Sequence, residues 1–213
     1  MANGTLKVGT ITTSSGSGTV TLGQSGETVA LGSGATSSGN FGNFDKLEDI
    51  NVTSDVSGVE INLDYSGYTA FKLIIKKLNK SGTSSSNVQF RVKRSGQSSF
   101  DSGASDYGNQ GILYDNGTNR NDNNNVNSIA MLTGAGTGLF TLRVEALITG
   151  AQETDIQFQM QGVTSIAENG GSTSTYGFGG TRYNNTEKVT AIQITDTAQN
   201  IGVCIGTLYG LKA

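Results

Sequence analysis

The amino-acid sequence predicts an all-β protein, built mainly as an antiparallel β-sandwich. Three observations carry this prediction. Glycine reaches 31 of 213 residues, Ser, Thr and Asn fill much of the rest, and proline is absent. Short runs of Val, Ile, Thr and Phe alternate with Gly, Ser and Asn clusters, which is typical of strands joined by turns. The net charge is only -3 and the chain has 8 Phe and 7 Tyr, so global disorder is not expected.

The first element is a repeat near the N-terminus. Residues 10–13 (TITT), 19–22 (TVTL) and 28–31 (TVAL) recur every nine residues, with small or turn-forming residues between them. Such short strands cannot bury their own apolar face, so they stack or pair between chains. We expect residues 1–40 to form an arm or anchor shared among subunits. The alternative is that these are three edge strands of the sandwich. The interface side chains of the arm would be Ile11, Val20, Leu22, Val29 and Leu31.

Residues 32–43 (GSGATSSGNFGN) have the composition of a flexible connection, and we place the sandwich domain at residues 41–213. About eight strands follow, judged from alternating or continuous apolar runs. They are expected near residues 59–63, 68–78, 88–92, 129–132, 139–148, 156–160, 189–194 and 203–211. The core is expected to contain Phe71, Leu73, Ile74, Phe90, Val92, Phe140, Leu142, Val144, Phe158 and Ile192.

Two polar segments, residues 95–111 and 115–127, are expected to be long loops. The second resembles a calcium loop only superficially, because its carboxylates stand at Asp115 and Asp122 and the terminal Glu of an EF-hand is missing. We therefore expect an ordinary exposed loop rather than a metal site. Loops at the tip of a sandwich are nevertheless a common place for binding function.

The catalytic equipment of most hydrolases is missing. The chain has no histidine, which excludes a Ser-His-Asp triad, a Cys-His pair and a histidine-ligated zinc. Residues 134–138 (GAGTG) lack the Lys-Ser/Thr of a phosphate-binding loop. Glycan hydrolysis by two carboxylates stays open, but nothing in the sequence pairs the candidates. We expect no enzymatic activity, no cofactor and no metal; the candidate carboxylates are Asp101, Asp106, Glu145 and Glu153.

Charge and hydropathy narrow the partners. The basic residues form no distinct patch, so no nucleic acid is expected. No run of about 20 apolar residues exists, so no membrane insertion is expected. No secretory signal is expected, because residues 1–10 lack a basic region followed by an apolar run, and the single cysteine, Cys204, fits a buried position in a protein made in a reducing cytosol.

Aromatic side chains in or beside the expected loops suggest a second kind of partner. Lectin-like sites stack sugars on aromatic rings, so a host-glycan-binding module is one hypothesis. The competing interpretation is that these rings pack the loops onto the core, and the absence of Trp favours it. The residues concerned are Tyr107, Tyr114, Tyr176, Phe178 and Tyr183.

Three stretches resemble structural proteins of tailed bacteriophages, especially marine and cyanobacterial ones. They are the opening TLKVGTITTSSGSGTVTLGQSGETVAL, the central VQFRVKRSGQSSFDSGASDY and the closing GTLYGLKA. The turn at residues 95–97 departs from the pattern because it lacks an acidic residue. The resemblance implies a virion structural protein, synthesised in the cytoplasm of the host bacterium. A jelly roll is then the expected topology, since virus surface proteins use it widely.

The resemblance implies a role on the particle and leaves its station open. The first hypothesis is a tail fibre or tail-attached appendage, anchored by residues 1–40, that displays the sandwich. The alternative is a capsid decoration or cement protein on the phage head, and the second alternative is the glycan-binding module. The expected partners are further copies of the chain in a homo-oligomer, as a trimer, and other virion proteins.

Overall fold

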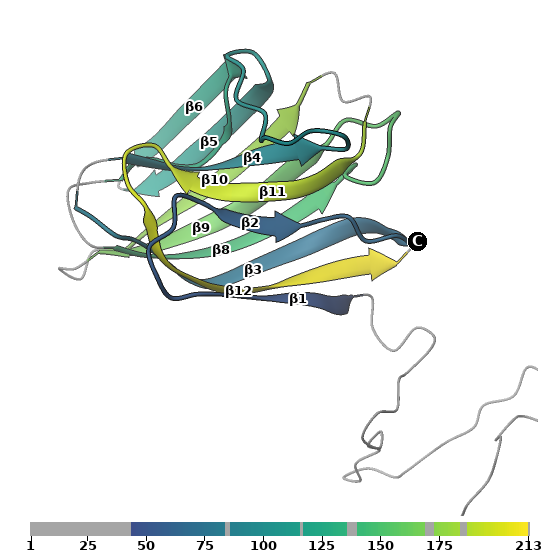
Figure 1. Cartoon of the computed structure of the whole chain (residues 1–213). Helices are drawn as coiled ribbons and strands as arrows, with labels where there is room; N and C mark the ends of the chain where they lie inside the picture. Colours follow the sequence, from purple (N-terminus) through teal and green to yellow (C-terminus); the bar gives the residue numbers. More distant parts are fainter. Residues whose placement is uncertain are drawn as a thin grey trace, which may run out of the picture. The chain divides into compact units, whose positions relative to one another are not determined.

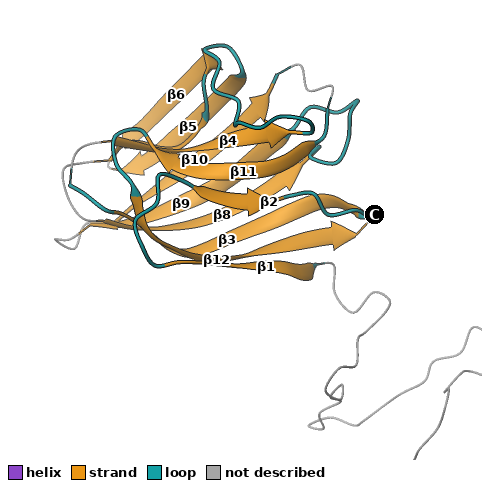
Figure 2. Ribbon diagram, viewed as in Figure 1, coloured by secondary structure: helices purple, strands orange, loops and turns teal. Residues whose placement is uncertain are grey.

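The computed structural model of the chain describes residues 44–83, 86–115, 117–135, 140–168, 173–183 and 187–212, with side chains placed except at 112–125, 132–135, 140, 168 and 173–174. Every regular element in these ranges is a β-strand, and the strands form two antiparallel sheets packed as a sandwich (Figures 1 and 2). The predicted all-β sandwich is therefore confirmed. The repeats at residues 10–31, with all five expected interface residues of the arm, lie outside the described residues.

The described residues form a large sheet of eight strands and a small sheet of four. In spatial order, the large sheet contains β1 (Asp45–Val52), β12 (Ile201–Lys212), β3 (Tyr68–Lys80), β8 (Phe140–Thr149), β9 (Gln159–Glu168), β10 (Thr173–Arg182), β5 (Tyr107–Asp115) and β6 (Gly117–Val126). The small sheet contains β2 (Val59–Asn62), β11 (Val189–Asp196), β4 (Ser86–Arg94) and β7 (Ile129–Ala135).

The strand pairing is that of a jelly roll. When β5, β6, β9 and β10 are left out, eight strands remain. Counted along the chain, the first of these eight pairs with the last, the second with the seventh, the third with the sixth and the fourth with the fifth. These pairs are β1–β12, β2–β11, β3–β8 and β4–β7, all antiparallel. This nested pairing is that of a jelly roll, which consists of two Greek keys, so the expected topology is confirmed.

Two inserted pairs of strands widen one sheet beyond the jelly roll. β5 and β6 lie between β4 and β7 in the chain, and β9 and β10 lie between β8 and β11. All four join the large sheet beyond β8, in the order β9, β10, β5, β6. The chain therefore has an extended sheet face beside its jelly roll.

The expected loops at residues 95–111 and 115–127 were wrong in part, because they contain most of β5 and all of β6. Gly and Asn disfavour strands locally, but here the backbone is fixed by pairing to neighbouring strands, which overrides propensity. For the same reason β10 (TSTYGFGGTR) was not predicted. The strand expected at residues 156–160 begins only at Gln159, and Ile156 is exposed.

The core lies between the two sheets. Phe90 of the small sheet and Phe178 of the large sheet bring their ring centroids within 5.9 Å. Ile74 was wrongly expected in the core: it is half-buried, because alternation on β3 turns Leu73 and Ile75 inward. The side chain of Phe140 lies outside the described ones. The remaining core predictions are confirmed, with Phe71, Leu73, Phe90, Val92, Leu142, Val144, Phe158 and Ile192 all buried.

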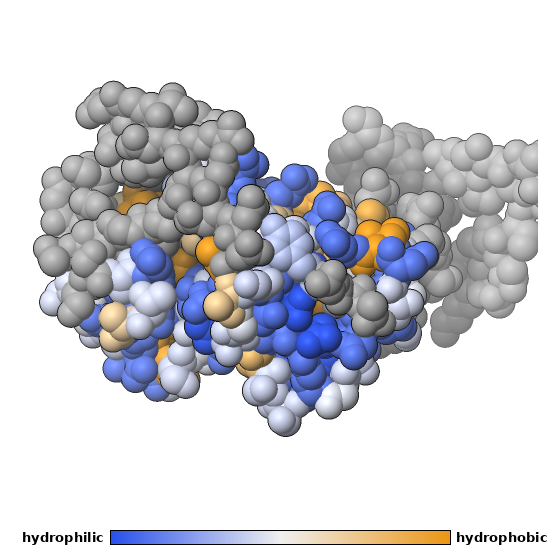
Figure 3. Space-filling model, turned by 90° about the horizontal axis from the view of Figure 1, so that it is seen from above, coloured by the Kyte–Doolittle hydropathy of each residue, from blue (hydrophilic) through white to orange (hydrophobic). Residues whose placement is uncertain are grey.

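The surface of the described part is mostly polar where Figure 3 shows it. Hydrophilic residues dominate this view from above, and the apolar ones occur in small separate areas. Scattered apolar residues of this kind are normal on soluble surfaces. Among the residues that the structure describes, no helix is long and apolar enough to cross a membrane.

Candidate functional site

A buried ion cluster ties the segment between β4 and β5 to the end of β10. Asp101 accepts hydrogen bonds at Oδ2 from Arg94 Nε (2.9 Å) and Arg182 Nε (2.8 Å), and at Oδ1 from Gln97 Nε2 (3.1 Å). The side chains of Asp101 and Arg182 are only 7% and 8% exposed. Arg94 also forms an ion pair with Glu187 at the surface. We call Asp101, Arg94, Arg182 and Gln97 the charge clasp.

Tyr107 completes the surroundings of the charge clasp. Its hydroxyl donates to the carbonyl oxygen of Asp101 (3.1 Å) and accepts from the amide of Val92 (2.9 Å). The guanidinium of Arg182 lies 5.9 Å from the centre of the Tyr107 ring. Burial raises the pKa of this phenol, which therefore stays protonated. The stretch FDSGASDY, singled out in the sequence, thus folds around a buried charge.

Electrostatics fixes the protonation state of Asp101. Burial by itself raises the pKa of its carboxyl group, but the hydrogen bonds from Arg94, Arg182 and Gln97 together lower it below the ordinary value of 3.8. A carboxyl group held ionised in this way does not donate a proton at neutral pH. The charge clasp is therefore suited to holding the structure together rather than to acid catalysis.

The other candidate carboxylates are not assembled as an acid–base pair. Asp106 Oδ1 lies 3.4 Å from the guanidinium of Arg182, and its Oδ2 accepts a hydrogen bond from the amide of Gly103. Glu145 forms an ion pair with Lys72, at 2.5 Å, on the outer face of the large sheet. Glu153 lies in the turn between β8 and β9. In the described ranges, no group of three or more Cys, Asp or Glu side chains is placed to hold a metal ion.

The aromatic residues proposed for sugar stacking do not form one surface. Tyr107, Tyr176 and Phe178 lie on β5 and β10, not in loops, and all three are buried. Buried rings present no face to a ligand, so the stacking hypothesis does not hold for them. Tyr183 is half-buried beside a hollow described next, and the side chain of Tyr114 lies outside the described ones.

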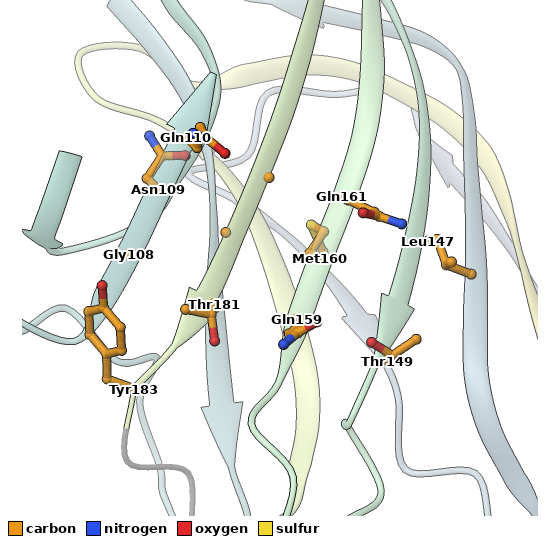
Figure 4. Close-up of a pocket in the computed structure, with 12 residues that line it drawn as sticks. Gly108, Asn109, Gln110, Leu147, Thr149, Gln159, Met160, Gln161, Thr181 and Tyr183 are labelled. Carbon is orange, nitrogen blue, oxygen red and sulfur yellow. The ribbon is translucent and has the colours of Figure 1, made fainter. Parts of the chain in front are cut away.

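The extended sheet carries a hollow of about 510 Å³ on its outer face, across β8, β9, β10 and β5 (Figure 4). Strand register brings its first row of residues together. Leu147 pairs with Gln161, Gln161 with Gly179, and Gly179 with Gln110. We call this feature the amide hollow. It is created by the inserted strands, since the jelly-roll strands supply only β8.

A second row lies one step along the same strands. Thr149 pairs with Gln159, Gln159 with Thr181, and Thr181 with Gly108. The hydroxyl of Tyr183 lies over Gly108, where any larger side chain would collide with it. None of the described residues that line the amide hollow is charged. Its side chains are chiefly amides and hydroxyls, which both donate and accept hydrogen bonds.

Glycines make the floor of the hollow. The outward positions of β10 between Thr175 and Thr181 are Gly177 and Gly179, so no side chain rises from the strand there. A Cβ at Gly179 would meet only the carbonyl oxygen of Met160, at an ordinary distance of 3.8 Å. The space above Gly179 is therefore open, and it forms a furrow along β10 between the side chains of β9 and β5.

An apolar depression of about 720 Å³ adjoins the amide hollow and shares Gln110, Leu147, Gln161 and Gly179 with it. Val163 is 46%, Phe44 40% and Leu147 37% exposed, and all three line this depression. The ion pair of Lys72 and Glu145 lies on the same face. The outer face thus combines amides with exposed apolar groups, two aliphatic and one aromatic.

The residues of the amide hollow were not predicted from the sequence, although one signal was present. Gln159 and Gln161 alternate with the buried Met160, and Gly177 and Gly179 alternate with buried Tyr176, Phe178. That alternation indicates a strand with a bare outer face. Taken alone, Gly177 and Gly179 had indicated a turn in place of a strand.

The fold and these features define the class: a jelly-roll β-sandwich protein with a laterally extended sheet. Comparison with protein-family models, with curated proteins and with solved structures finds no match to the chain. Function is therefore argued from the chain's own residues.

Proposed function

We propose that the chain is a structural protein of a bacteriophage particle, a tail fibre or tail-attached appendage. The observation that supports this most is the jelly-roll pairing of β1–β12, β2–β11, β3–β8 and β4–β7. Virus surface proteins use this fold widely. It occurs here in a chain whose opening, centre and closing stretches resemble phage structural proteins.

The charge clasp supports a structural rather than an enzymatic role for the central stretch. Asp101 and Asp106 of FDSGASDY are both ion-paired with Arg182, and neither is paired with the other as an acid and a base. A displayed domain also needs a loop that resists unfolding, and a buried, fully hydrogen-bonded carboxylate fixes this one.

The arm supplies the attachment in this proposal. Burying Val20, Leu22 or Val29 against another chain would contribute about 1.5–3 kcal/mol for each side chain. That gain is available in a homo-oligomer, for which we propose a trimer, or against another virion protein. A capsid decoration protein on the head, whose arm clamps neighbouring capsid subunits, is the alternative within the same class.

Immunogold electron microscopy of purified particles of the virus that carries this gene tests the proposal. Antibodies raised against residues 44–213 are expected to label the tail of intact particles. Label on the head instead would support the decoration protein. Absence of the chain from purified particles, checked by mass spectrometry of their proteins, would contradict the whole proposal.

A further inference from the structure

We propose that the amide hollow is a binding site for a neutral oligosaccharide. The inference goes beyond the proposed place on a virus particle and does not depend on it, because it rests on the outer face of β8, β9, β10 and β5 alone. Four properties of this face carry it: charge, hydrogen-bonding capacity, shape and the pairing of its backbone.

The lack of charged side chains in the described lining argues against an ionic ligand. Among the side chains that the structure describes, no Lys, Arg, Asp or Glu lines the amide hollow. The nearest charges on the adjoining depression, Lys72 and Glu145, are 2.5 Å apart and neutralise each other. Proteins bind nucleic acids and acidic polymers mainly through Lys and Arg, and the described lining of the amide hollow contains neither. The ligand that fits is uncharged.

Hydrogen-bonding capacity points to hydroxyl groups. Gln159 and Gln161 each carry an amide that donates and accepts, Thr149 carries a hydroxyl, and the Thr181 hydroxyl, which donates to the carbonyl oxygen of Phe158, can still accept. Gln110 and Tyr183 add further polar groups to the lining. Figure 4 shows these side chains distributed along both sides of β10 and at the end of the hollow. A sugar ring likewise carries hydroxyls that donate and accept along its edge, so the two sets are complementary.

Shape fits a chain of rings. The furrow is walled by β9 and β5 on either side of β10, so its walls stand about 9–10 Å apart. The four residue steps from Gly177 to Thr181 extend over about 13 Å. The exposed aliphatic groups of Leu147 and Val163 lie where the C–H faces of a sugar can pack. Length, width and mixed polarity therefore match an oligosaccharide lying along β10.

The backbone argues against an extended peptide as the occupant. A peptide binds a sheet best by adding a strand at an open edge, where unpaired N–H and C=O groups receive it. β10 is paired with β9 on one side and with β5 on the other. The floor of the furrow consequently offers no unpaired strand edge, and a ligand must bind through side chains.

The test titrates the full chain with neutral oligosaccharides of glucose, galactose, mannose and N-acetylglucosamine by isothermal titration calorimetry, at low and at high salt. Heparin fragments and oligogalacturonate serve as acidic probes. At least one neutral oligosaccharide is expected to bind, with an affinity that salt leaves unchanged, since no charge is involved.

Gly179→Val should lower that affinity by about tenfold or more, because its side chain occupies the furrow at a position where a Cβ makes only ordinary contact. Thr175→Val is the matched control: it places the same side chain on the same face of β10, outside the hollow, and should leave binding unchanged. Gln161→Ala, at an exposed position, provides a second loss-of-binding variant should Gly179→Val fold poorly.

Three results would overturn the proposal. One is that no neutral oligosaccharide binds at millimolar concentration, and another is that only the acidic probes bind, with strong salt dependence. The third is that Gly179→Val and Gln161→Ala bind normally but dissociate the oligomer in light scattering, which would make the face a contact between copies of the chain.

Discussion

Asp101 is a buried carboxylate whose three side-chain donors keep it ionised. Burying an ion pair costs free energy of desolvation. Removing one partner destabilises the folded protein further, because the other charge stays buried without a counter-charge. The charge clasp therefore makes stability depend on a single position. Three predictions belong to this scale, two for Asp101 and one for the buried thiol of Cys204.

Asp101→Asn is expected to lower the free energy of unfolding by about 3–5 kcal/mol, since Arg94 and Arg182 lose a shared anion in a buried place. Urea unfolding followed by circular dichroism measures this. Asp155→Asn, at an exposed position, is the control and should have almost no effect. A loss below about 1 kcal/mol at Asp101 would show that the charge clasp does not stabilise the fold.

The same carboxylate predicts an acid response. Because the folded-state pKa of Asp101 lies below its ordinary value of 3.8, its contribution is complete above that pH and is lost as pH falls through the lowered pKa. Urea unfolding of the wild type at decreasing pH should show this loss, and Asp101→Asn should show a smaller one. Equal acid sensitivity of the two proteins would contradict it.

Cys204 should be inert in the folded protein. Burial raises the pKa of its thiol to about 12, so the reactive thiolate is scarce at neutral pH. An aromatic disulfide reagent is expected to label it only when denaturant unfolds the domain. Rapid labelling of the native protein would mean that β12 opens readily in solution.

Individual strands show how the same residue type serves opposite purposes. Gly162 of β9 faces inward, and a Cβ there would collide with the carbonyl oxygen of Glu145 and lie 2.8 Å from Phe178 Cζ. Gly179 of β10 faces outward into open space. One glycine permits close packing of two strands, and the other keeps the furrow empty.

This contrast predicts opposite effects of one substitution. Gly162→Ala should destabilise the protein by about 1–3 kcal/mol, because backbone on β8 cannot move away cheaply. Gly179→Ala should leave stability unchanged or raise it by about 0.5–1 kcal/mol, since Ala restricts the unfolded chain more than Gly. Thermal unfolding of the pair measures both. Similar losses in the two variants would show that Gly179 is not in open space.

Alternation made β2 and β4 predictable, because Val59 and Ile61, or Val88, Phe90 and Val92, mark one buried face each. β5, β6 and β10 were not predictable in that way, since their Gly and Asn residues are ordinary turn formers. The amide hollow was even less predictable from the sequence. It depends on the register that sets Gln161, Gly179 and Gln110 side by side, and register arises only when distant segments pair.

At the scale of the whole molecule, the described strands of the large and small sheets lie between Asp45 and Lys212. The core between Phe90, Phe178 and their neighbours is drawn from the same region. The division expected at residue 40, in which the arm attaches a domain that folds on its own, stays a prediction, because residues 1–43 lie outside the described ones. The division itself is open to a direct test.

Deletion of residues 1–40 should leave far-ultraviolet circular dichroism of the sandwich intact, yet abolish the proposed trimer in light scattering and the proposed incorporation into particles. Replacing Val20 and Val29 together by Asp should act in the same direction to a smaller extent. Failure of the truncated chain to fold would mean that the repeats are strands of the sandwich. Normal incorporation would show that the arm is not the anchor.

The pairing of β1 with β12 has a consequence for synthesis. Asp45 lies opposite Gly210, so the first strand of the domain can be completed only by the last one. On the ribosome, β1 must wait through the translation of nearly the whole domain before its partner emerges. Domains dominated by such distant pairings fold slowly, over milliseconds to seconds. The polar residues along β1, such as Lys46, Glu48 and Asp49, then protect the waiting strand from pairing with a neighbouring nascent chain.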